Sequence, residues 1–383
     1  MFNTPLLDDY HRDLAAEVDA VVRDEICGAF HGESEEAHSR NLLKVLAESG
    51  LLKWTVPANF EDGANVLDVR SLCVVRDRLS YESSLADLMF AMQGLGSFPI
   101  SLAGTDAIKK RILPRVKNGE SIAAFAITEP DAGSDVSAIQ TTARPDGSHY
   151  VLDGVKTFIS NAGLADFYTV FAKTDLDKGS KGISAFVVES DAPGFRFEEK
   201  IELMAPHPMG RIRFDGCRVP RENRLGEEGE GFKLAMTTLD TFRPTVGAAA
   251  AGLAHRALDE ATSYAKRRKQ FGKPLADFQA TQLKLADMAT SLDAARLLIF
   301  RAAWKKDIEG GRVTLESAMA KLFATEAAQR IIDASVQIHG GVGVVRGSVV
   351  EHLYREIRAL RIYEGTSEIQ KLVIASQLLR ESK

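Results

Sequence analysis

One carboxylate near the C-terminus has surroundings that could make it a proton acceptor. Glu364 lies beside the flexible Gly365, and apolar residues are close by in the sequence, among them Ile362 and Tyr363. A carboxylate that such neighbours shield from water has a raised pKa and is suited to abstracting a proton. A solvated loop carboxylate fits the same pattern, and the local sequence by itself favours that second interpretation.

Regular elements must hold this carboxylate if it is functional, because catalytic groups concentrate on loops that a rigid scaffold positions. Ser367 and Gln370 have the spacing of a capping box, which predicts that a helix begins near Glu368. Glu364 would then lie in the loop immediately before that helix.

Three other segments have residue types that suit a polar or phosphorylated ligand. Residues 128–135 offer hydroxyl and free N–H groups after an apolar segment, although a plain connection between strands fits them as well. Residues 266–269 are all basic, which suits either a helix C-terminus or a phosphate site. Residues 341–347 are rich in glycine but lack the spacing and the preceding strand of a dinucleotide fingerprint. We therefore expect no NAD site there, and a loop that lets a ligand approach the backbone stays open as an interpretation.

The period of the apolar residues divides the chain into three parts. Up to about residue 121 they recur every three or four positions, which predicts amphipathic helices. From about 122 to 225, short segments rich in β-branched and aromatic residues predict strands. From about 230 the helical period returns in longer stretches, which suggests a bundle. The predicted helices are 5–26, one that stops at Gly50, 68–82, 105–117, 280–306 and 316–337, and the predicted strands are 123–127, 150–159, 167–172 and 183–188, with a hairpin turn at Asp153-Gly154 and helix ends at Gly310-Gly311 and Gly340-Gly341.

This order predicts an α+β protein with an N-terminal helical domain (1–121), a middle β domain (122–229) and a C-terminal helical bundle domain (230–383). The length of 383 residues agrees with two or three domains. With 48 basic and 53 acidic residues the net charge is −5, so we expect no nucleic-acid partner. The sequence has no run of 18 apolar residues, so we also expect no membrane insertion.

The three cysteines, Cys27, Cys73 and Cys217, are far apart in the sequence. They form no CxxC motif and no cluster with histidine, so we expect neither a disulfide framework nor a metal site, and each should be a small buried apolar residue. Free thiols suit a reducing compartment, and the first residues lack the basic and apolar regions of a signal peptide. The expected location is the cytoplasm of a bacterium, with the mitochondrial matrix as the alternative.

Six segments, taken together in their order and spacing, closely resemble the acyl-CoA dehydrogenase family of flavoproteins. Each is weak evidence alone, but the joint match covers nearly the whole chain and reverses the local interpretations given above. The segments are 124–135, 158–161, 217–220, 268–272, 337–341 and 363–366. The resemblance implies an N-terminal helical domain, a middle β domain and a C-terminal four-helix bundle. It also implies FAD, an acyl-CoA substrate, an electron-transfer flavoprotein as electron acceptor and a homotetramer.

Carried over position by position, the resemblance assigns most of the matching residues to the cofactor. Residues 158 and 160 would pack on and bond to the isoalloxazine ring, and the segments 268–271 and 337–341 would reach the FAD of a neighbouring subunit. The residues expected at FAD are Phe125, Ile127, Thr128, Ser134, Phe158, Ile159, Ser160, Arg268, Gln270, Phe271, Gln279, Gln337, Gly340, Gly341, Thr366 and Glu368, and those expected at the acyl-CoA are Ser134, Asp240, Arg243 and Gly365.

The reaction that the resemblance implies is α,β-dehydrogenation of an acyl-CoA thioester to the trans-2-enoyl-CoA. Glu364 would take the α-proton while a hydride moves from the β-carbon to flavin N5. The FAD ribityl hydroxyl and the backbone N–H of Glu364 would polarise the thioester carbonyl, as an oxyanion hole does. Aromatic side chains at Phe125, Phe158 and Phe242 suggest a short, branched or cyclic acyl group.

The chain departs from the family pattern at a few positions. Some relatives carry the base at the position of Phe242, which cannot accept a proton, so Glu364 is the matching base. Phe158 and Glu368 stand where many relatives have Trp and Gln. The segment around His207 departs most, and we expect that residue to be a histidine of a surface loop.

Two other classes of function stay open. A flavin-dependent oxidase or monooxygenase on the same fold would use oxygen, but a monooxygenase has no need of Glu364. A non-catalytic FAD-binding or nucleic-acid-associated scaffold is disfavoured by the acidic net charge and by the intact segment around that base.

Overall fold

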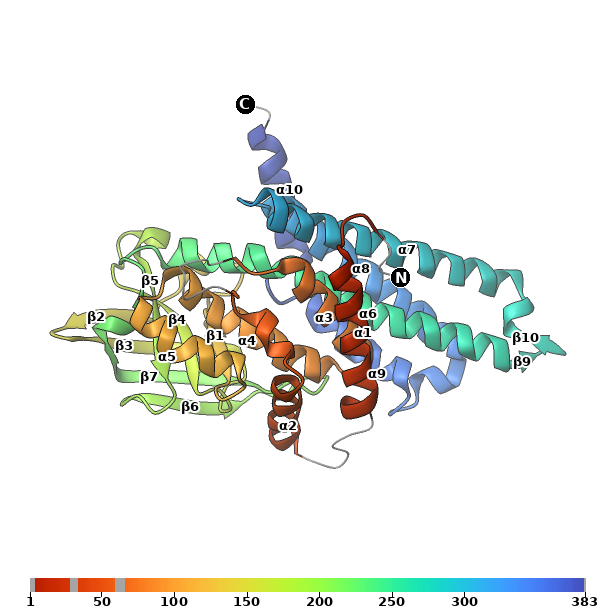
Figure 1. Ribbon diagram of the computed structural model, residues 1–383, viewed down its shortest axis with the longest axis horizontal. Coiled ribbons are helices and arrows are strands. Elements are labelled where there is room, and N and C mark those ends of the chain that lie inside the picture. Colours follow the sequence, from red (N-terminus) through yellow and green to blue (C-terminus); the bar gives the residue numbers. More distant parts are fainter. Residues whose placement is uncertain (1–3, 28–33, 59–65, 382–383) are drawn as a thin grey trace. The chain divides into compact units, whose positions relative to one another are not determined.

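The protein is described by a computed structural model over residues 4–27, 34–58 and 66–381, which divide into two compact units. Unit 1 comprises Met1–Cys27, Val69–Asp87 and Asp240–Lys383, and unit 2 comprises Gly28–Asp68 and Leu88–Leu239. The division falls within two long helices, α4 (Ser84–Ala103) and α6 (Gly231–Arg267), each of which begins in one unit and ends in the other (Figure 1).

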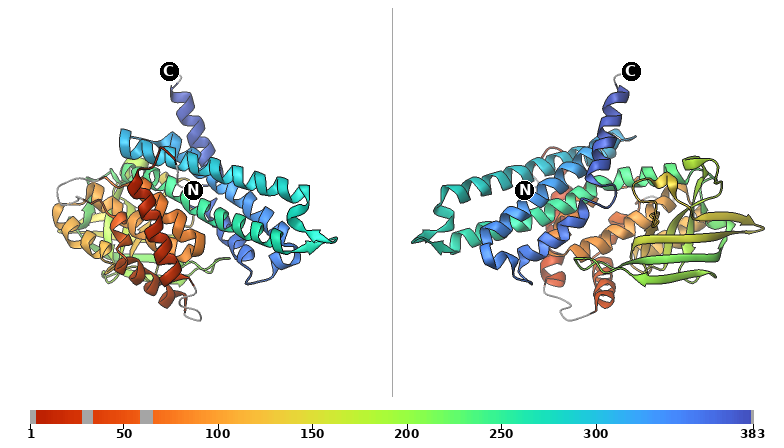
Figure 2. Two further views of the ribbon diagram at one scale, coloured as in Figure 1. Left: turned by 45° about the vertical axis from the view of Figure 1, so that its right-hand side comes forward. Right: turned by 180° about the vertical axis from the view of Figure 1, so that it is seen from behind.

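Unit 1 is helical. Its elements, besides parts of α4 and α6, are α1 (Asp9–Val21), α3 (Val69–Glu82), α7 (Gln279–Trp304), α8 (Thr314–His339), α9 (Val349–Leu360), α10 (Ser367–Glu381) and a short hairpin of β9 (Lys269–Gln270) and β10 (Lys273–Pro274). The helices α7 and α8 lie side by side, and α9 and α10 both pack on α8 (Figure 2). The loop that carries Glu364 therefore connects two helices, α9 and α10, that both pack on α8.

Small side chains allow α3 to approach α6 closely. A Cβ at Gly252 of α6 would lie 2.2 Å from the carbonyl oxygen of Asp77 and 2.1 Å from Oγ of Ser80, so only glycine fits at this crossing. Asp77 also forms a buried bidentate ion pair with Arg296 of α7, at 2.8 and 2.9 Å. One carboxylate thus ties α3 to α7 beside the point where α3 meets α6.

Unit 2 is built on an eight-stranded sheet with the order β6-β7-β3-β2-β4-β5-β8, and β1 pairs in parallel with β4. The strands are β1 (Ala123–Ala126), β2 (Thr142–Asp146), β3 (His149–Ser160), β4 (Phe167–Lys173), β5 (Ile183–Glu189), β6 (Phe195–Lys200), β7 (Met209–Pro220) and β8 (Arg224–Leu225). The helices α2 (Glu35–Glu48) and α5 (Asp106–Lys117) belong to this unit as well. β4 and β5, buried along nearly their whole length, are continuous apolar strands rather than alternating ones.

The predicted helices and strands are all present to within a few residues. The prediction of a hairpin turn at Asp153-Gly154 is wrong. Both residues lie inside β3, where the pairing with β7 shifts register between Leu152 and Gly154. Gly154 has a φ of 152°, and a Cβ there would lie 2.7 Å from Cα of Thr141. Gly154 therefore lies at a β-bulge where two backbone segments approach closely, and it does not form a turn.

The sequence did not predict α4. The helix is apolar and contains Gly94, Gly96 and Pro99, so it shows no amphipathic period and has residues that usually end helices. It meets the length and composition of a membrane-spanning helix, but 89% of that window is buried inside the protein. Burial on all sides explains both the missing period and the apolar composition.

Two local expectations also need correction. Cys27 is exposed, with Sγ 3.2 Å from Oε1 of Glu82, whereas Cys73 and Cys217 are buried as predicted. The hydroxyl of Ser367 donates to Glu326 instead of capping α10. Thr366, one position earlier, accepts the N–H of Ile369 with its side chain, so the cap is displaced by one residue.

Replacement of Asp77 with Asn should lower the free energy of unfolding by about 3 kcal/mol, because the guanidinium of Arg296 loses its buried counter-ion. Urea unfolding at neutral pH measures the loss. The matched control is Asp24→Asn, which breaks an exposed pair with Arg23 and should leave the free energy of unfolding nearly unchanged. Equal losses in the two variants would contradict the role given to the buried pair.

Candidate active site

The loop between α9 and α10 holds Glu364 in a strained backbone conformation. Glu364 has a φ of 53°, which side chains other than glycine rarely adopt, and Gly365 follows at 93°. The carbonyl oxygen of Glu364 accepts hydrogen bonds from Nε of Arg243 at 3.4 Å and from Nε2 of Gln370 at 3.1 Å. The next carbonyl, of Gly365, accepts from Gln370 at 3.0 Å and from Nζ of Lys321 at 2.8 Å. Donors from three helices therefore fix the backbone on which the carboxylate stands.

The carboxyl group of Glu364 is largely shielded from water. Its Oε2 is buried and has no hydrogen-bond partner among the residues that the structure describes. Burial raises the pKa of Glu364 above its ordinary value, and Asp87 acts in the same direction. The charges of Arg76, Lys321 and Arg243 oppose the rise. The result is a carboxylate of increased basicity, with nearby cations that oppose part of the increase.

Two of these cations each form an ion pair with another carboxylate. Arg76 of α3 forms a buried bidentate pair with Asp87 of α4, with both bonds 2.7 Å long. Arg243 of α6 bonds to Asp240 at 2.6 Å, and the other oxygen of Asp240 accepts from Oγ1 of Thr314 at 2.6 Å. These pairs hold the two guanidinium groups in place beside Glu364.

Asp240, Arg243, Gly365 and Glu364, which the sequence analysis named separately, are thus brought together in unit 1. The contacts that the structure shows for Asp240 and Arg243 are internal and support the loop. Their binding to coenzyme A stays a prediction. Sequence reasoning missed Lys321, Arg76 and Asp87, because single charged residues in helical stretches carry no motif.

A second group of predicted residues gathers in unit 2, at the end of β1 and in β3. Phe125, Ile127 and Ile159 are buried, whereas Thr128 is half-buried and accepts the N–H of Thr157 through its carbonyl at 3.0 Å. Ser134 is exposed in the loop that follows. This pairing connects the loop after β1 directly to the β3 segment that carries the other expected ring contacts.

Phe158 presents an aromatic side chain from a strained position. Its φ is 54°, and 58% of the residue is exposed. An apolar ring held in the left-handed region and open to solvent is an uncommon and costly arrangement, which points to a ligand contact.

His207 is more buried than a surface-loop histidine, which corrects our expectation. It is half-buried, and its Nε2 lies 2.8 Å from Oγ of Ser160, one of the expected cofactor contacts. Burial lowers the pKa of His207 to about 4, so the imidazole is neutral at neutral pH. The segment that departs most from the family pattern therefore touches a predicted site residue.

A buried ion pair fixes the loop after β1. Nζ of Lys156 lies 2.8 Å from Oε1 of Glu129 and donates to the carbonyl of Ile127 at 3.1 Å. Glu129 also accepts the N–H groups of Gln140 and Thr141. Burial raises the pKa of Glu129, but Lys156 and these hydrogen bonds outweigh it and hold the pKa below its ordinary value. Sequence reasoning missed Lys156, which lies inside a strand.

The remaining predicted residues lie on other parts of unit 1. The β9–β10 hairpin, at one end of the bundle in Figure 1, carries Phe271, which is 93% exposed with a φ of 51°. Arg268, Gln270, Gln279, Gln337, Gly340 and Gly341 are exposed near it in sequence or at the end of α8, and Glu368 is exposed at the start of α10 beside the half-buried Thr366. That these residues serve a neighbouring subunit stays a prediction.

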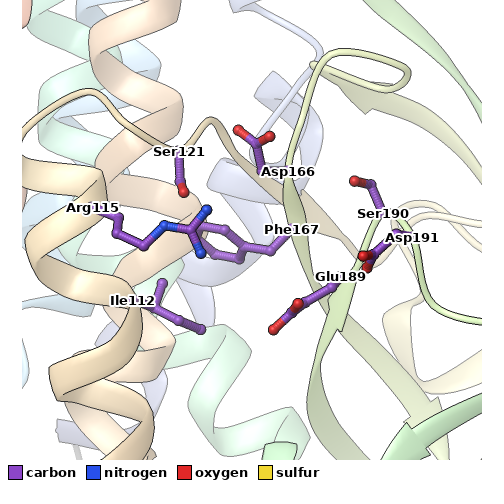
Figure 3. A pocket seen from close by; sticks show the side chains of 8 residues that line it. All are labelled: Ile112, Arg115, Ser121, Asp166, Phe167, Glu189, Ser190 and Asp191. Atoms are coloured by element: carbon purple, nitrogen blue, oxygen red, sulfur yellow. The ribbon is translucent and has the colours of Figure 1, made fainter.

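A pocket of about 170 Å³ in unit 2 contains none of the predicted residues. Figure 3 shows the side chains that line it, which come from α5, from β4 and β5 and from the adjoining loops. They are Ile112, Arg115, Ser121, Asp166, Phe167, Glu189, Ser190 and Asp191. We assign no role to it, because its acidic and basic groups show no arrangement for a particular ligand.

Replacement of Lys156 with Met should weaken the binding of the flavin that the resemblance implies. The buried carboxylate of Glu129 would lose its counter-ion, and the loop would lose the bond to the carbonyl of Ile127. We expect about a tenfold rise in the dissociation constant, equivalent to about 1.4 kcal/mol. Flavin fluorescence during titration of the apoprotein measures it. Lys178→Met, which breaks an exposed pair with Asp175, is the control, and an equal effect in both variants would contradict the assignment.

Comparison with known proteins places this geometry in context. Sequence models of the acyl-CoA dehydrogenase N-terminal, middle and C-terminal domains match residues 8–120, 124–217 and 229–379. A 3-(aryl)acrylate reductase of Clostridium sporogenes is 41% identical over 373 residues, which is 96% of each chain. The caffeyl-CoA reductase-Etf complex subunit CarC of Acetobacterium woodii is 39% identical, covering 97% of this chain and 96% of that protein.

Solved structures agree with the sequence matches. Butyryl-CoA dehydrogenase from Megasphaera elsdenii superimposes with a TM-score of 0.90 at 36% identity, covering 97% of this chain and 99% of the other. An acyl-CoA dehydrogenase from Bacillus anthracis, complexed with FAD, gives a TM-score of 0.89 at 33% identity and covers 99% of this chain and 68% of the other. The predicted fold, with its helical, β and helical parts, is confirmed, and the chain belongs to the acyl-CoA dehydrogenase family, whose cofactor is FAD.

Proposed function

We propose that this protein removes the α-proton of an acyl-CoA thioester with the carboxylate of Glu364, as the first part of an α,β-dehydrogenation to the enoyl-CoA. The observation that carries the proposal is the environment of that carboxylate. It is shielded from water, its pKa is raised by burial, and its backbone is held in a strained conformation by Arg243, Lys321 and Gln370. Strain of this kind is kept where function requires it.

The backbone N–H of Glu364 supports the same assignment. It has no acceptor within the described part of the chain, whereas the N–H of Tyr363 bonds to Ala359 and that of Ser367 to Arg361. A free N–H beside the base can donate to the thioester carbonyl. This donation would stabilise the negative charge that develops as the α-proton leaves.

The residues of this chain fit FAD. Phe158 offers an exposed ring, and the carbon positions that a side chain would fill at Gly133, Gly340 and Gly341 are open, so a ligand can approach the backbone there. When bound, FAD supplies the acceptor for the hydride that leaves the β-carbon. The residues that would hold it are Phe125, Ile127, Thr128, Ser134, Phe158, Ile159, Ser160, Thr366 and Glu368 in one chain, and Arg268, Gln270, Phe271, Gln279, Gln337, Gly340 and Gly341 from a neighbouring subunit.

Each residue at the site has a separate role in the proposed reaction. Glu364 accepts the proton, and its N–H orients and polarises the thioester. Phe158 and Ser160 position the cofactor, and His207 fixes the hydroxyl of Ser160 through their 2.8 Å contact. Shielding of the carboxylate from water keeps the proton transfer between substrate and base.

The acyl group that we propose is short, branched or cyclic. Phe242 is 1% exposed in α6, one residue from Arg243, and Tyr363 precedes the base in its loop. An aromatic residue next to the base in the chain, and another next to Arg243, favour a site with less room for a long acyl chain. The similarity to a butyryl-CoA dehydrogenase and to a 3-(aryl)acrylate reductase supports a short or ring-bearing acyl group.

We also propose an electron-transfer flavoprotein as the electron acceptor and a homotetramer as the working assembly. The relative from Acetobacterium woodii is a subunit of a complex with such a flavoprotein, which supports the first proposal. The second is supported by exposed apolar residues on the helices and loops of unit 1, among them Leu283, Leu297, Val344, Leu372 and Leu379.

Replacement of Glu364 with Gln should leave FAD bound but slow the anaerobic bleaching of the flavin by acyl-CoA by more than about a thousandfold, because an amide cannot accept the proton. Stopped-flow absorbance with a panel of linear, branched, cyclic and dicarboxylic acyl-CoAs measures the rate and the substrate class together. Glu351→Gln in α9, at a half-buried residue paired with Arg355, makes the same change in charge and should bleach normally. Normal bleaching in Glu364→Gln would refute the assignment, and fast reoxidation of the reduced enzyme by oxygen would favour an oxidase.

The pH dependence of the same reaction follows from the sign of the pKa shift. The active form of Glu364 is the carboxylate, and burial raises its pKa, so kcat/KM should rise with pH through a value above the ordinary 4.5 of a glutamate. Steady-state kinetics across the acid range measure the midpoint. A profile that is already flat at pH 5 would show that the base titrates at an ordinary value and would contradict its burial.

A further inference from the structure

We propose that Lys321 is the counter-ion of Glu364 and a positioning residue for its loop. The proposal rests on the proposed role of Glu364 as the base. Lys321 belongs to α8, is 0% exposed, and donates from Nζ to the carbonyl of Gly365 at 2.8 Å. A lysine buried to this degree is rare unless it is paired, because an isolated ammonium loses its hydration at great cost.

The two arginines near this loop already have carboxylate partners, unlike Lys321. Arg76 is paired with Asp87, and Arg243 is paired with Asp240. Among the described residues, neither Lys321 nor Glu364 has an ion pair within 4 Å. The bond from Nζ of Lys321 to the carbonyl of Gly365 nevertheless holds the ammonium one residue from Glu364, where the charge of Glu364 raises the pKa of Lys321, and Arg76 and Lys321 both lower that of Glu364.

The other charged groups near Lys321 do not replace Glu364. Glu326 is engaged by Arg361 at 2.8 Å and by the hydroxyl of Ser367 at 2.6 Å. Glu368 is exposed and bonds to Thr366, so water screens its charge. Arg243 repels Lys321 and cannot compensate it. The half-buried Tyr363 beside Glu364 has a pKa raised by burial and stays neutral, so it contributes no charge.

The compensation has a consequence for the reaction. Burial lowers the pKa of Lys321 to about 8, and the charge of the Glu364 carboxylate opposes this shift. The ammonium in turn favours the ionised form of Glu364, which is the form that can accept a proton. The bond to Gly365 adds a positional effect, because it holds the carbonyl next to the strained backbone of the base.

The electrostatic and the positional effects can be separated by substitution. Lys321→Gln keeps a donor for the carbonyl of Gly365 but removes the charge, Lys321→Met removes both, and Lys321→Arg keeps both. We expect the acidic limb of the kcat/KM profile to move up by about one pH unit in Lys321→Gln and Lys321→Met, and to stay near the wild-type position in Lys321→Arg. Lys321→Met should also lose about tenfold in the limiting rate of flavin bleaching at high pH, where Glu364 is ionised in every variant.

Lys305→Met is the matched control, because it removes a lysine that is paired with Glu316 at the surface of the same unit. Its acidic limb should coincide with that of the wild type. An unshifted limb in both Lys321→Gln and Lys321→Met would overturn the proposal. So would a shift of equal size in Lys305→Met.

A double-mutant cycle tests the pairing without any activity. If Lys321 and Glu364 are counter-ions, the loss of melting temperature in the double variant Lys321→Gln/Glu364→Gln is smaller than the sum of the two single losses. Additive losses would contradict the pairing, even if Glu364→Gln has abolished the reaction as proposed. If Lys321→Gln fails to fold alone, folding that is restored by Glu364→Gln supports the proposal, and failure in both backgrounds overturns it.

Discussion

Burial of the Glu364 carboxylate is the constraint to which the rest of unit 1 is fitted. A carboxylate withdrawn from water gains basicity, but without compensation it would be protonated at neutral pH and could not act as a base. Three helices each place one cation near the carboxylate. These cations are Arg76 on α3, Arg243 on α6 and Lys321 on α8. Because both arginines bring their own carboxylates, the net positive charge that faces Glu364 is small. These cations favour the ionised form of Glu364, while burial still raises its pKa above the ordinary value.

The two units use the same physical device to hold their functional loops. In unit 1, Lys321 donates to the carbonyl of Gly365 beside the base. In unit 2, Lys156 donates to the carbonyl of Ile127 and pairs with Glu129 in the loop after β1. Both lysines are fully buried, and burial lowers the pKa of each to about 8. A buried ammonium that bonds to a main-chain carbonyl fixes the backbone itself, which a contact between two side chains does not.

The sequence predicted the elements and the residues that belong to short motifs, and it failed where burial overrides local pattern. Amphipathic helices and β-rich segments were found because their periods are local, but α4 has no polar face and went unpredicted. Asp153-Gly154 has the letters of a turn, yet pairing with β7 keeps it within β3. Lys321 and Lys156 could not be singled out, since their roles arise from neighbours that are distant in the sequence. Whether the motif residues bind as the resemblance implies stays a prediction.

The protonation state of Glu364 is the most direct test of the account. Infrared difference spectra recorded across the acid range, with Glu364→Gln as the reference, isolate the stretching band of this one protonated carboxyl group. The account predicts a single titration with a midpoint above 4.5. A midpoint at or below 4.5 would contradict a base whose pKa is raised by burial.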